Sequence, residues 1–129
     1  MTPHDTPVLR VAGRPVGGYV TRPELQEPPE VFTAGREGEA AVHGTRADWV
    51  ALAGGTWTLV FAGATERTRR DPWFVRAGEY RGVGSSPASE ERLAVAPGET
   101  VVRRIVTVVA DGRLPRIGAA ALIRKAVSQ

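Results

Sequence analysis

The chain contains no cysteine among its 129 residues. This absence excludes disulfide bonds, thiolate metal ligands and a cysteine nucleophile. Histidine and methionine are also rare: there are two histidines, His4 and His43, and a single methionine. Copper and zinc sites need several imidazole or sulfur ligands close together, so we expect no bound metal. Gly82 and Gly84 lack the third glycine of a dinucleotide fingerprint, so no other cofactor is expected.

Long hydrophobic runs are missing as well. The longest apolar stretches, near Leu59 and Ile105, have the length of strands and fall far short of the roughly 18 residues of a membrane-spanning helix. The N-terminal residues are polar, and no apolar signal core follows them. The sequence therefore predicts a protein that does not enter the membrane, and a cytoplasmic location is the simplest interpretation.

Lysine is nearly absent, since the basic residues are 16 arginines and one lysine. They stand against 14 acidic residues, which leaves a net charge of only +3. A nucleic-acid-binding domain gathers its basic residues on one face. The local clusters here are short and comprise Arg67, Arg69 and Arg70, and Arg103 with Arg104. A solvated basic surface accounts for them, and nucleic acid is not expected as a partner.

What the sequence does contain is the pattern of one small β-rich domain spanning residues 1–129. We expect an N-terminal hairpin over residues 1–22 and a proline- and glutamate-rich linker over residues 23–44, in which only residues 31–33 resemble a strand. The main strands follow over residues 45–112, and a helical tail over residues 113–129. The predicted fold class is mainly β: an antiparallel β-sandwich or twisted sheet with a C-terminal helix.

The clearest hairpin joins residues 49–53 to residues 56–62 through Gly54 and Gly55. Alternation places Trp57 on one face of the second strand, together with Leu59 and Phe61, and we expect that face to pack in the core.

Other segments of the chain have weaker patterns. Residues 65–71 are predicted as a charged loop with room for one helical turn. Strands are predicted over residues 73–81 and 100–109, the latter rich in β-branched residues. A helix is predicted over residues 115–127, because apolar residues recur there at helical spacing. The residues of that stripe are Ile117, Ala121, Leu122 and Ala126.

Residues 71–81 carry the densest set of candidate functional side chains. Trp73 and Val75 alternate with Phe74 and Arg76, so one face can pack while the other meets solvent or a ligand. A carboxylate beside an aromatic plane suits sugar binding, since sugar C–H faces stack on rings and hydroxyls need polar partners. The ligand-binding residues proposed from the sequence are Trp73, Arg76, Glu79, Tyr80 and His43.

Simpler interpretations of the same residues stay open. The polar face of this strand can be merely solvated, with Trp73 in the core beside Trp49 and Trp57. His43 is a candidate base or ligand, or else an ordinary surface residue. No catalytic residue is assigned, because Ser85 has no adjacent base and Asp71 no neighbouring carboxylate in the sequence.

Several motifs follow one another in an order that resembles a known family. They are residues 9–16, residues 32–39 with His43 and Gly44, and residues 57–61, 71–76, 93–100 and 108–112. Together they resemble a bacterial, largely actinobacterial, family labelled "methane oxygenase PmoA-like". The resemblance implies strands similar to the β-sandwiches of sugar mutarotases and, on fold analogy alone, carbohydrates as ligands. Members of that family are usually longer and carry a His-rich central segment that nothing here matches, so the chain resembles an internally shortened member.

Three functions are compatible with these observations. The leading one is a non-catalytic, carbohydrate-associated β-sandwich domain. The first alternative is a sugar-metabolising enzyme, epimerase- or hydrolase-like, with Glu79, Arg76 and His43 in its site. The second is an interaction module that forms a homodimer, or binds a partner chain, through strand edges left unpaired by the missing centre.

Overall fold

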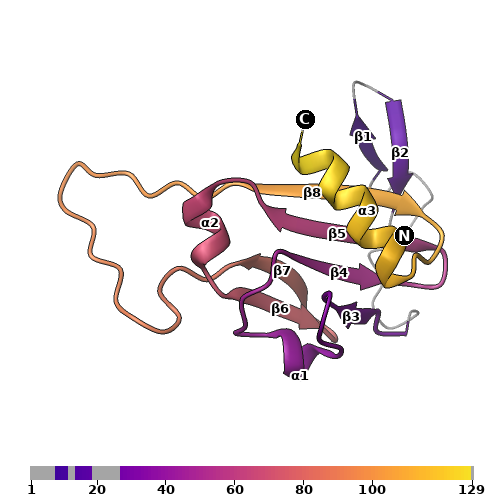
Figure 1. The fold of residues 1–129 in the computed structure, drawn as a ribbon, viewed down its shortest axis with the longest axis horizontal. Coiled ribbons are helices and arrows are strands. Elements are labelled where there is room, and N and C mark those ends of the chain that lie inside the picture. The colour runs from indigo at the N-terminus through magenta and orange to yellow at the C-terminus, as the bar shows by residue number, and fades with distance from the viewer. Residues whose placement is uncertain (1–7, 12–13, 19–26, 129) are drawn as a thin grey trace.

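A four-stranded antiparallel sheet, in the order β3-β4-β5-β8, forms the centre of the molecule (Figure 1). The structure is a computed structural model that describes residues 8–11, 14–18 and 27–128. The remaining strands form two antiparallel ribbons, β1-β2 and β6-β7. The predicted fold class, mainly β with a C-terminal helix, is therefore confirmed. The elements in chain order are β1 (Val8–Val11), β2 (Arg14–Gly18), β3 (Glu30–Phe32), α1 (Glu39–Val42), β4 (Trp49–Ala53), β5 (Trp57–Gly63), α2 (Glu66–Arg70), β6 (Trp73–Ala77), β7 (Arg81–Ser85), β8 (Ile105–Asp111) and α3 (Arg116–Val127).

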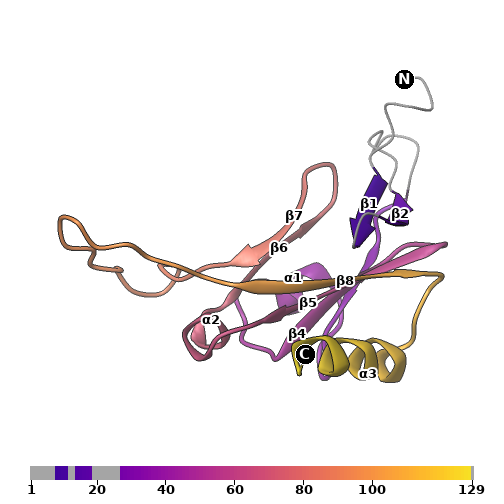
Figure 2. The ribbon, with the colours of Figure 1, turned by 90° about the horizontal axis from the view of Figure 1, so that it is seen from above.

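Both faces of the central sheet are covered, which gives the domain two apolar cores. Helix α3 lies across one face, and the β6-β7 ribbon with α1 lies across the other (Figure 2). Small side chains on the strands let the helix approach the sheet closely. The core under α3 comprises Phe32, Trp49, Ala51, Ala53, Val60, Ala62, Ala119 and Ile123. The core under the ribbon comprises Val31, Val42, Val50, Leu52, Trp73, Val75 and Ala77.

Both faces of β5 pack in a core: Trp57 and Phe61 pack against the core under the ribbon, as expected, and the opposite face is the more deeply buried one. Thr58 and Val60 are fully buried beneath α3, whereas Trp57, Leu59 and Phe61 are only partly buried. Thr58 tolerates burial because its hydroxyl donates to the Gly112 carbonyl at 2.8 Å and accepts the Leu114 N–H at 2.9 Å. These two bonds tie the turn between β8 and α3 to the sheet.

The predicted strand over residues 73–81 is in fact the first half of a hairpin. Strand β6 ends at Ala77, which pairs with Arg81, and the chain reverses through Gly78, Glu79 and Tyr80. Strand β7 then returns along β6, over residues for which the sequence predicts no second strand. The sequence pattern does not indicate this strand, because Gly82 and Gly84 stand where a typical strand has β-branched or aromatic residues.

Strand β8 begins at Ile105, five residues later than predicted. Its partner β5 ends at Gly63, which pairs with Ile105, and the chain then turns into α2. Residues 100–104 therefore have the composition of a strand but no strand to pair with. They end a long irregular segment, residues 86–104, that extends from one end of the body (Figures 1 and 2).

The C-terminal helix occupies the predicted residues but presents a different face to the sheet. Ala119 and Ile123 are buried, whereas Ile117, part of the predicted stripe, is 85% exposed. The one-turn helix α2 forms within the predicted charged loop, with Thr65 as its N-cap. Helix α1 arises within the segment interpreted as a linker, and its Val42 is fully buried.

Some sequence expectations fall outside the described residues. These include the N-terminal histidine and the first four residues of the linker, 23–26. Of the helices within residues 27–128, α3 is the longest with 12 residues, and none is long and apolar enough to cross a membrane.

Candidate functional site

The outer edge of β6 is closed by side chains and backbone from the segment around α1, not by another strand. The Val75 N–H donates to His43 Nδ1 at 3.1 Å, and the Ala77 N–H donates to Glu39 Oε1 at 2.6 Å. Closer to the start of the strand, Trp73 exchanges backbone bonds with Gly44 and Thr45. Since Nδ1 accepts a hydrogen bond, the neutral His43 ring carries its proton on Nε2. His43 and Glu39 thus satisfy donors that an exposed edge would leave open.

The outer face of the β6-β7 ribbon carries an aromatic cluster. The guanidinium carbon of Arg76 lies 5.2 Å from the centroid of the Phe74 ring. The His43 ring meets the same ring edge-on, with centroids 5.3 Å apart and an interplanar angle of 79°. Phe74 therefore contacts both the Arg76 guanidinium and the His43 imidazole. The first contact has cation–π geometry and the second is T-shaped, and both geometries are attractive for an aromatic ring.

Two glycines leave the neighbouring strand without side chains beside these rings. Gly84 pairs with Phe74, and Gly82 pairs with Arg76. A Cβ atom placed on Gly82 would lie 3.8 Å from Phe74 Cε1 and 3.9 Å from Tyr80 Cε1, so both rings border the same space. A Cβ on Gly84 would meet no atom within 4 Å. Tyr80, at the turn, is 78% exposed. We call Phe74, Arg76, Tyr80, Gly82 and Gly84 the ribbon face.

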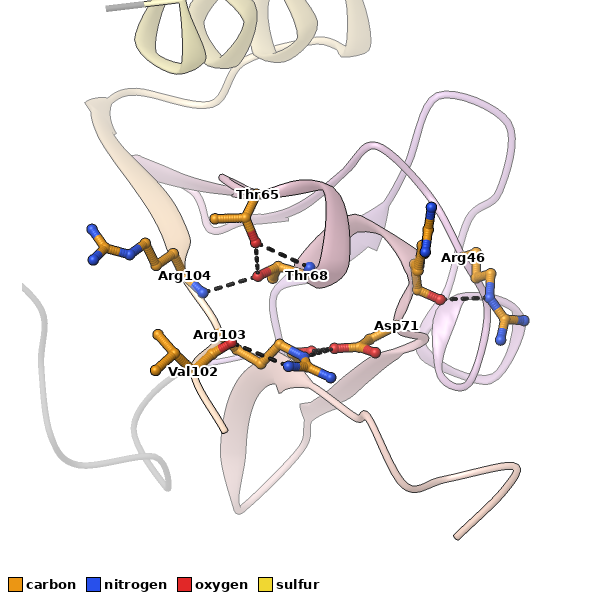
Figure 3. Close-up of polar contacts among 9 residues, drawn as sticks. Arg46, Thr65, Thr68, Asp71, Val102, Arg103 and Arg104 are labelled. Atoms are coloured by element: carbon orange, nitrogen blue, oxygen red, sulfur yellow. Dashed lines mark hydrogen bonds and ion pairs between the residues drawn. The ribbon is translucent and has the colours of Figure 1, made fainter. Parts of the chain in front are cut away.

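A second polar constellation surrounds Asp71, at the junction of α2 and β6 (Figure 3). Its Oδ2 accepts from Ser85 Oγ at 2.6 Å and from Arg103 Nε at 2.5 Å. The side chains of Asp71 and Arg103 are only 11% and 18% exposed. Ser85 ends β7 and Arg103 precedes β8, so one carboxylate fastens both ends of the 86–104 segment.

Two further contacts hold the base of that segment. The Arg104 N–H donates to Thr68 Oγ1 at 3.0 Å, and Thr68 Oγ1 shares a 2.7 Å bond with Thr65 Oγ1 (Figure 3). Arg46 donates from Nε to the Arg70 carbonyl at 2.8 Å.

Arg46 also forms a two-pronged pair with Glu90, at 3.0 and 3.1 Å. Hydrogen bonding to Glu90, and the charge of that carboxylate, raise the pKa of Arg46.

Residues 1–124 match a family of unknown function, DUF6807. The chain belongs to DUF6807. No curated protein and no solved structure matches it. The match assigns the chain to a family but assigns it no activity, and the PmoA-like label and the bacterial origin stay predictions.

The structure of this DUF6807 chain brings together some of the predicted ligand residues and separates others. Arg76 and His43 both contact Phe74, and Tyr80 lies at the end of the same ribbon. Glu79 is also in the turn. Trp73 faces the opposite way: it is 4% exposed in the core, and its indole N–H donates to the Ala47 carbonyl at 2.9 Å.

Sequence reasoning missed three members of the ribbon face, namely Phe74, Gly82 and Gly84. The alternation along residues 73–76 did place Phe74 with Arg76 on the outward side. The glycines carried the complementary signal, because residues two apart on a strand share a face.

Two other features bear on the chemistry available to this DUF6807 member. Beside the turn of the ribbon lies a shallow depression of about 310 Å³, lined by residues 28–31 and 37–39 together with Ala77 and Gly78. Within the described residues, no group of three histidine, aspartate or glutamate side chains is placed to hold a metal ion.

Proposed function

We propose that this DUF6807 chain is a non-catalytic binding domain that recognises carbohydrate through the ribbon face. The observation that carries the proposal is the convergence of Phe74 and Tyr80 on the space above Gly82. The exposed Tyr80 ring and the half-buried Phe74 ring, beside backbone that carries no side chain at Gly82, offer a surface on which the C–H face of a sugar ring can stack. The same proposal includes the PmoA-like resemblance, which implies carbohydrate ligands on fold analogy.

The polar groups around the rings suit hydroxyl recognition. Arg76 lies over Phe74 and donates one N–H to the Val75 carbonyl at 2.9 Å, which fixes the guanidinium beside the rings. A guanidinium has five N–H donors, so others are left to bond with sugar hydroxyls. Glu79, in the turn next to Tyr80, supplies an acceptor.

Two candidate acid–base groups near the ribbon already have structural duties. His43 Nδ1 accepts the Val75 N–H, and Glu39 Oε1 accepts the Ala77 N–H. Proton transfer through either atom would break an edge bond of β6. This supports binding without turnover and weighs against the epimerase- or hydrolase-like alternative.

The test is binding of the purified chain to an array of immobilised mono- and oligosaccharides, followed by calorimetry with the best ligand. Tyr80→Ala removes an exposed ring and should weaken binding by about fivefold, since one aromatic contact is worth about 1 kcal/mol. Gly84→Val places a branched side chain on the ribbon face and should abolish binding. The strand itself should be retained, because φ at Gly84 is not in the left-handed region.

Ile117→Ala, on the exposed side of α3, is the matched control and should bind like the unmodified chain. Absence of binding to every sugar would refute the carbohydrate class. Binding that is unchanged in Tyr80→Ala and Gly84→Val would refute the ribbon face as the site. Release of a modified sugar on incubation would favour the enzyme instead.

A further inference from the structure

Residues 88–102 form an arm that projects from one end of the molecule (Figures 1 and 2). Every residue of the arm is exposed. Irregular segments longer than about 12–15 residues are uncommon in compact domains, and ordered ones usually have a function. The arm therefore needs an explanation beyond connecting β7 to β8.

The arm has the sequence of a β-hairpin but none of its ladder. Its tip is a turn in which the Glu99 N–H donates to the Ala96 carbonyl at 3.0 Å and Gly98 adopts φ +85° after Pro97. Among the described backbone hydrogen bonds, the only other one within the arm and its base joins Ser89 to Ser86. Most of its N–H and C=O groups are thus available to another strand.

The arm also concentrates exposed apolar side chains. The described residues expose seven large hydrophobic side chains, and four of these lie on the arm. They flank the turn on both sides and are Leu93, Val95, Val101 and Val102, with 40%, 48%, 42% and 56% exposure. A solvated linker has no need of such residues, whereas a docking element does.

The base of the arm is held in place, so the arm is presented at a fixed position. Asp71 binds both Ser85 and Arg103, and Arg46 binds Glu90.

The arm carries three glutamates and one arginine, a net charge of −2, so the rest of the chain carries +5. Among the described ion pairs, none involves Arg67, Arg69 or Arg104, which lie in α2 and at the base of the arm.

We propose that the arm docks on the arm of a second copy of the chain, the two running antiparallel about a two-fold axis. In that arrangement Glu99, at the tip of each arm, reaches the arginine-rich base of the other copy, and the four apolar side chains pack against their counterparts. A two-fold contact uses the same surface on both copies, and this chain has both of the complementary charges. The Arg104 side chain points away from the Thr68 contact (Figure 3), which leaves it able to meet Glu99 of the second copy.

Sedimentation equilibrium of the full chain tests the arrangement. The unmodified chain should be dimeric at tens of micromolar. Val95→Ser combined with Val102→Ser should raise the dissociation constant by about tenfold or more, because exposed contacts of this kind govern association rather than folding. Ile117→Ser removes the most exposed apolar side chain outside the arm and should leave the dimer unchanged.

Charge exchange supplies the sharper test. Glu99→Arg and Arg104→Glu should each be monomeric alone, since each homodimer would place like charges together. An equimolar mixture of the two variants should regain the dimer, because both cross-contacts then join opposite charges. A monomeric unmodified chain, or a dimer that survives both the serine and the charge substitutions, would overturn the proposal. A monomer that binds some other protein through the arm would overturn it equally.

Discussion

At the scale of single residues, the histidine that a sequence survey singles out as a catalytic candidate has a structural task. His43 lies 32 positions before Val75 in the chain, yet its Nδ1 is the acceptor for the Val75 N–H. Sequence spacing cannot indicate such a contact, because it depends on how α1 packs beside β6. Glu39 does the same for Ala77 one turn of helix earlier.

Replacement of His43 by alanine should destabilise the domain by about 1–3 kcal/mol, because the buried Val75 N–H would lose its acceptor. His43→Asn keeps an acceptor near the Nδ1 position and should recover part of that loss. Urea denaturation measures both variants, and amide exchange of Val75 should accelerate in the alanine variant alone. Equal stability of His43→Ala and the unmodified chain would show that the bond contributes nothing.

The Asp71 carboxylate offers a comparison between a buried and an exposed ion pair. Asp71→Asn removes the charge opposite the largely buried Arg103 and should cost about 3 kcal/mol of unfolding free energy. Glu66→Gln breaks the exposed pair with Arg70, whose side chains are 72% and 76% accessible, and should cost about 0.5 kcal/mol or less. Chemical denaturation of the two variants side by side measures both losses of unfolding free energy. Similar losses would contradict a stabilising role for the buried Asp71–Arg103 pair.

At the scale of elements, the sequence predicts the residue range of helix α3 correctly but not the face that packs on the sheet. Its residues were predicted from apolar spacing, but alanines at positions 119, 120, 121 and 126 make several faces nearly equivalent in apolar character. The sheet beneath selects the face with Ala119 and Ile123, because small and medium side chains fit against Ala51 and Ala62. The stripe that includes Ile117 is left toward solvent.

The two isoleucines of α3 test that packing. Ile123→Ala should lower the unfolding free energy by about 2–5 kcal/mol, because it opens a cavity in the core under the helix. Ile117→Ala should change it by no more than about 0.5 kcal/mol, since that side chain is 85% exposed. Thermal and urea unfolding provide the measurement. A larger effect at Ile117 would mean that the helix is rotated.

The Gly54-Gly55 pair, predicted to form a single turn, has two separate roles. A Cβ on Gly54 would lie 2.4 Å from two atoms of the Trp57 indole, whereas a Cβ on Gly55 would meet nothing within 4 Å. The Gly54 N–H donates to the Trp57 carbonyl at 2.9 Å, so the reversal itself runs through Gly55 and Thr56. Gly54→Ala should therefore cost about 1–3 kcal/mol through displacement of the indole, and Gly55→Ala should be close to neutral in the same denaturation assay. The reverse order of effects would contradict the close approach of Trp57.

At the scale of the whole molecule, local patterns predicted the fold class, the β4-β5 hairpin, the end of β8 and the C-terminal helix. What they did not predict depends on contacts between distant segments. Strand β7 is glycine-rich, and β8 is shortened by the end of β5 at Gly63. For the candidate site, alternation placed Phe74 and Arg76 outward, but the pairing that brings Gly82 and Gly84 beside them required the hairpin.

The covered sheet also changes the case for self-association. The sequence predicts a dimer through unpaired strand edges, but a bare sheet face cannot drive it, because α3 and the β6-β7 ribbon cover both faces of the central sheet. Among the described residues, the arm carries four of the seven exposed large hydrophobic side chains, and its base contacts lie at residues 85, 90, 103 and 104. The proposed dimer therefore assigns folding and association to different parts of the chain.

Replacement of residues 91–101 by a short glycine-serine linker should separate these two properties. The linker keeps Glu90, Arg103 and Arg104, so every contact at the base of the arm can form, and a shorter loop costs less closure entropy. The unfolding free energy should stay within about 1 kcal/mol of the unmodified value, while the sedimenting mass should fall to that of a monomer. Asp71→Asn in the same shortened chain should still lower the unfolding free energy, which would show that the Asp71 contacts with Ser85 and Arg103 stabilise the fold without the arm. Loss of folding on removal of the arm would mean that the arm packs on its own domain, and the division of roles would then be wrong.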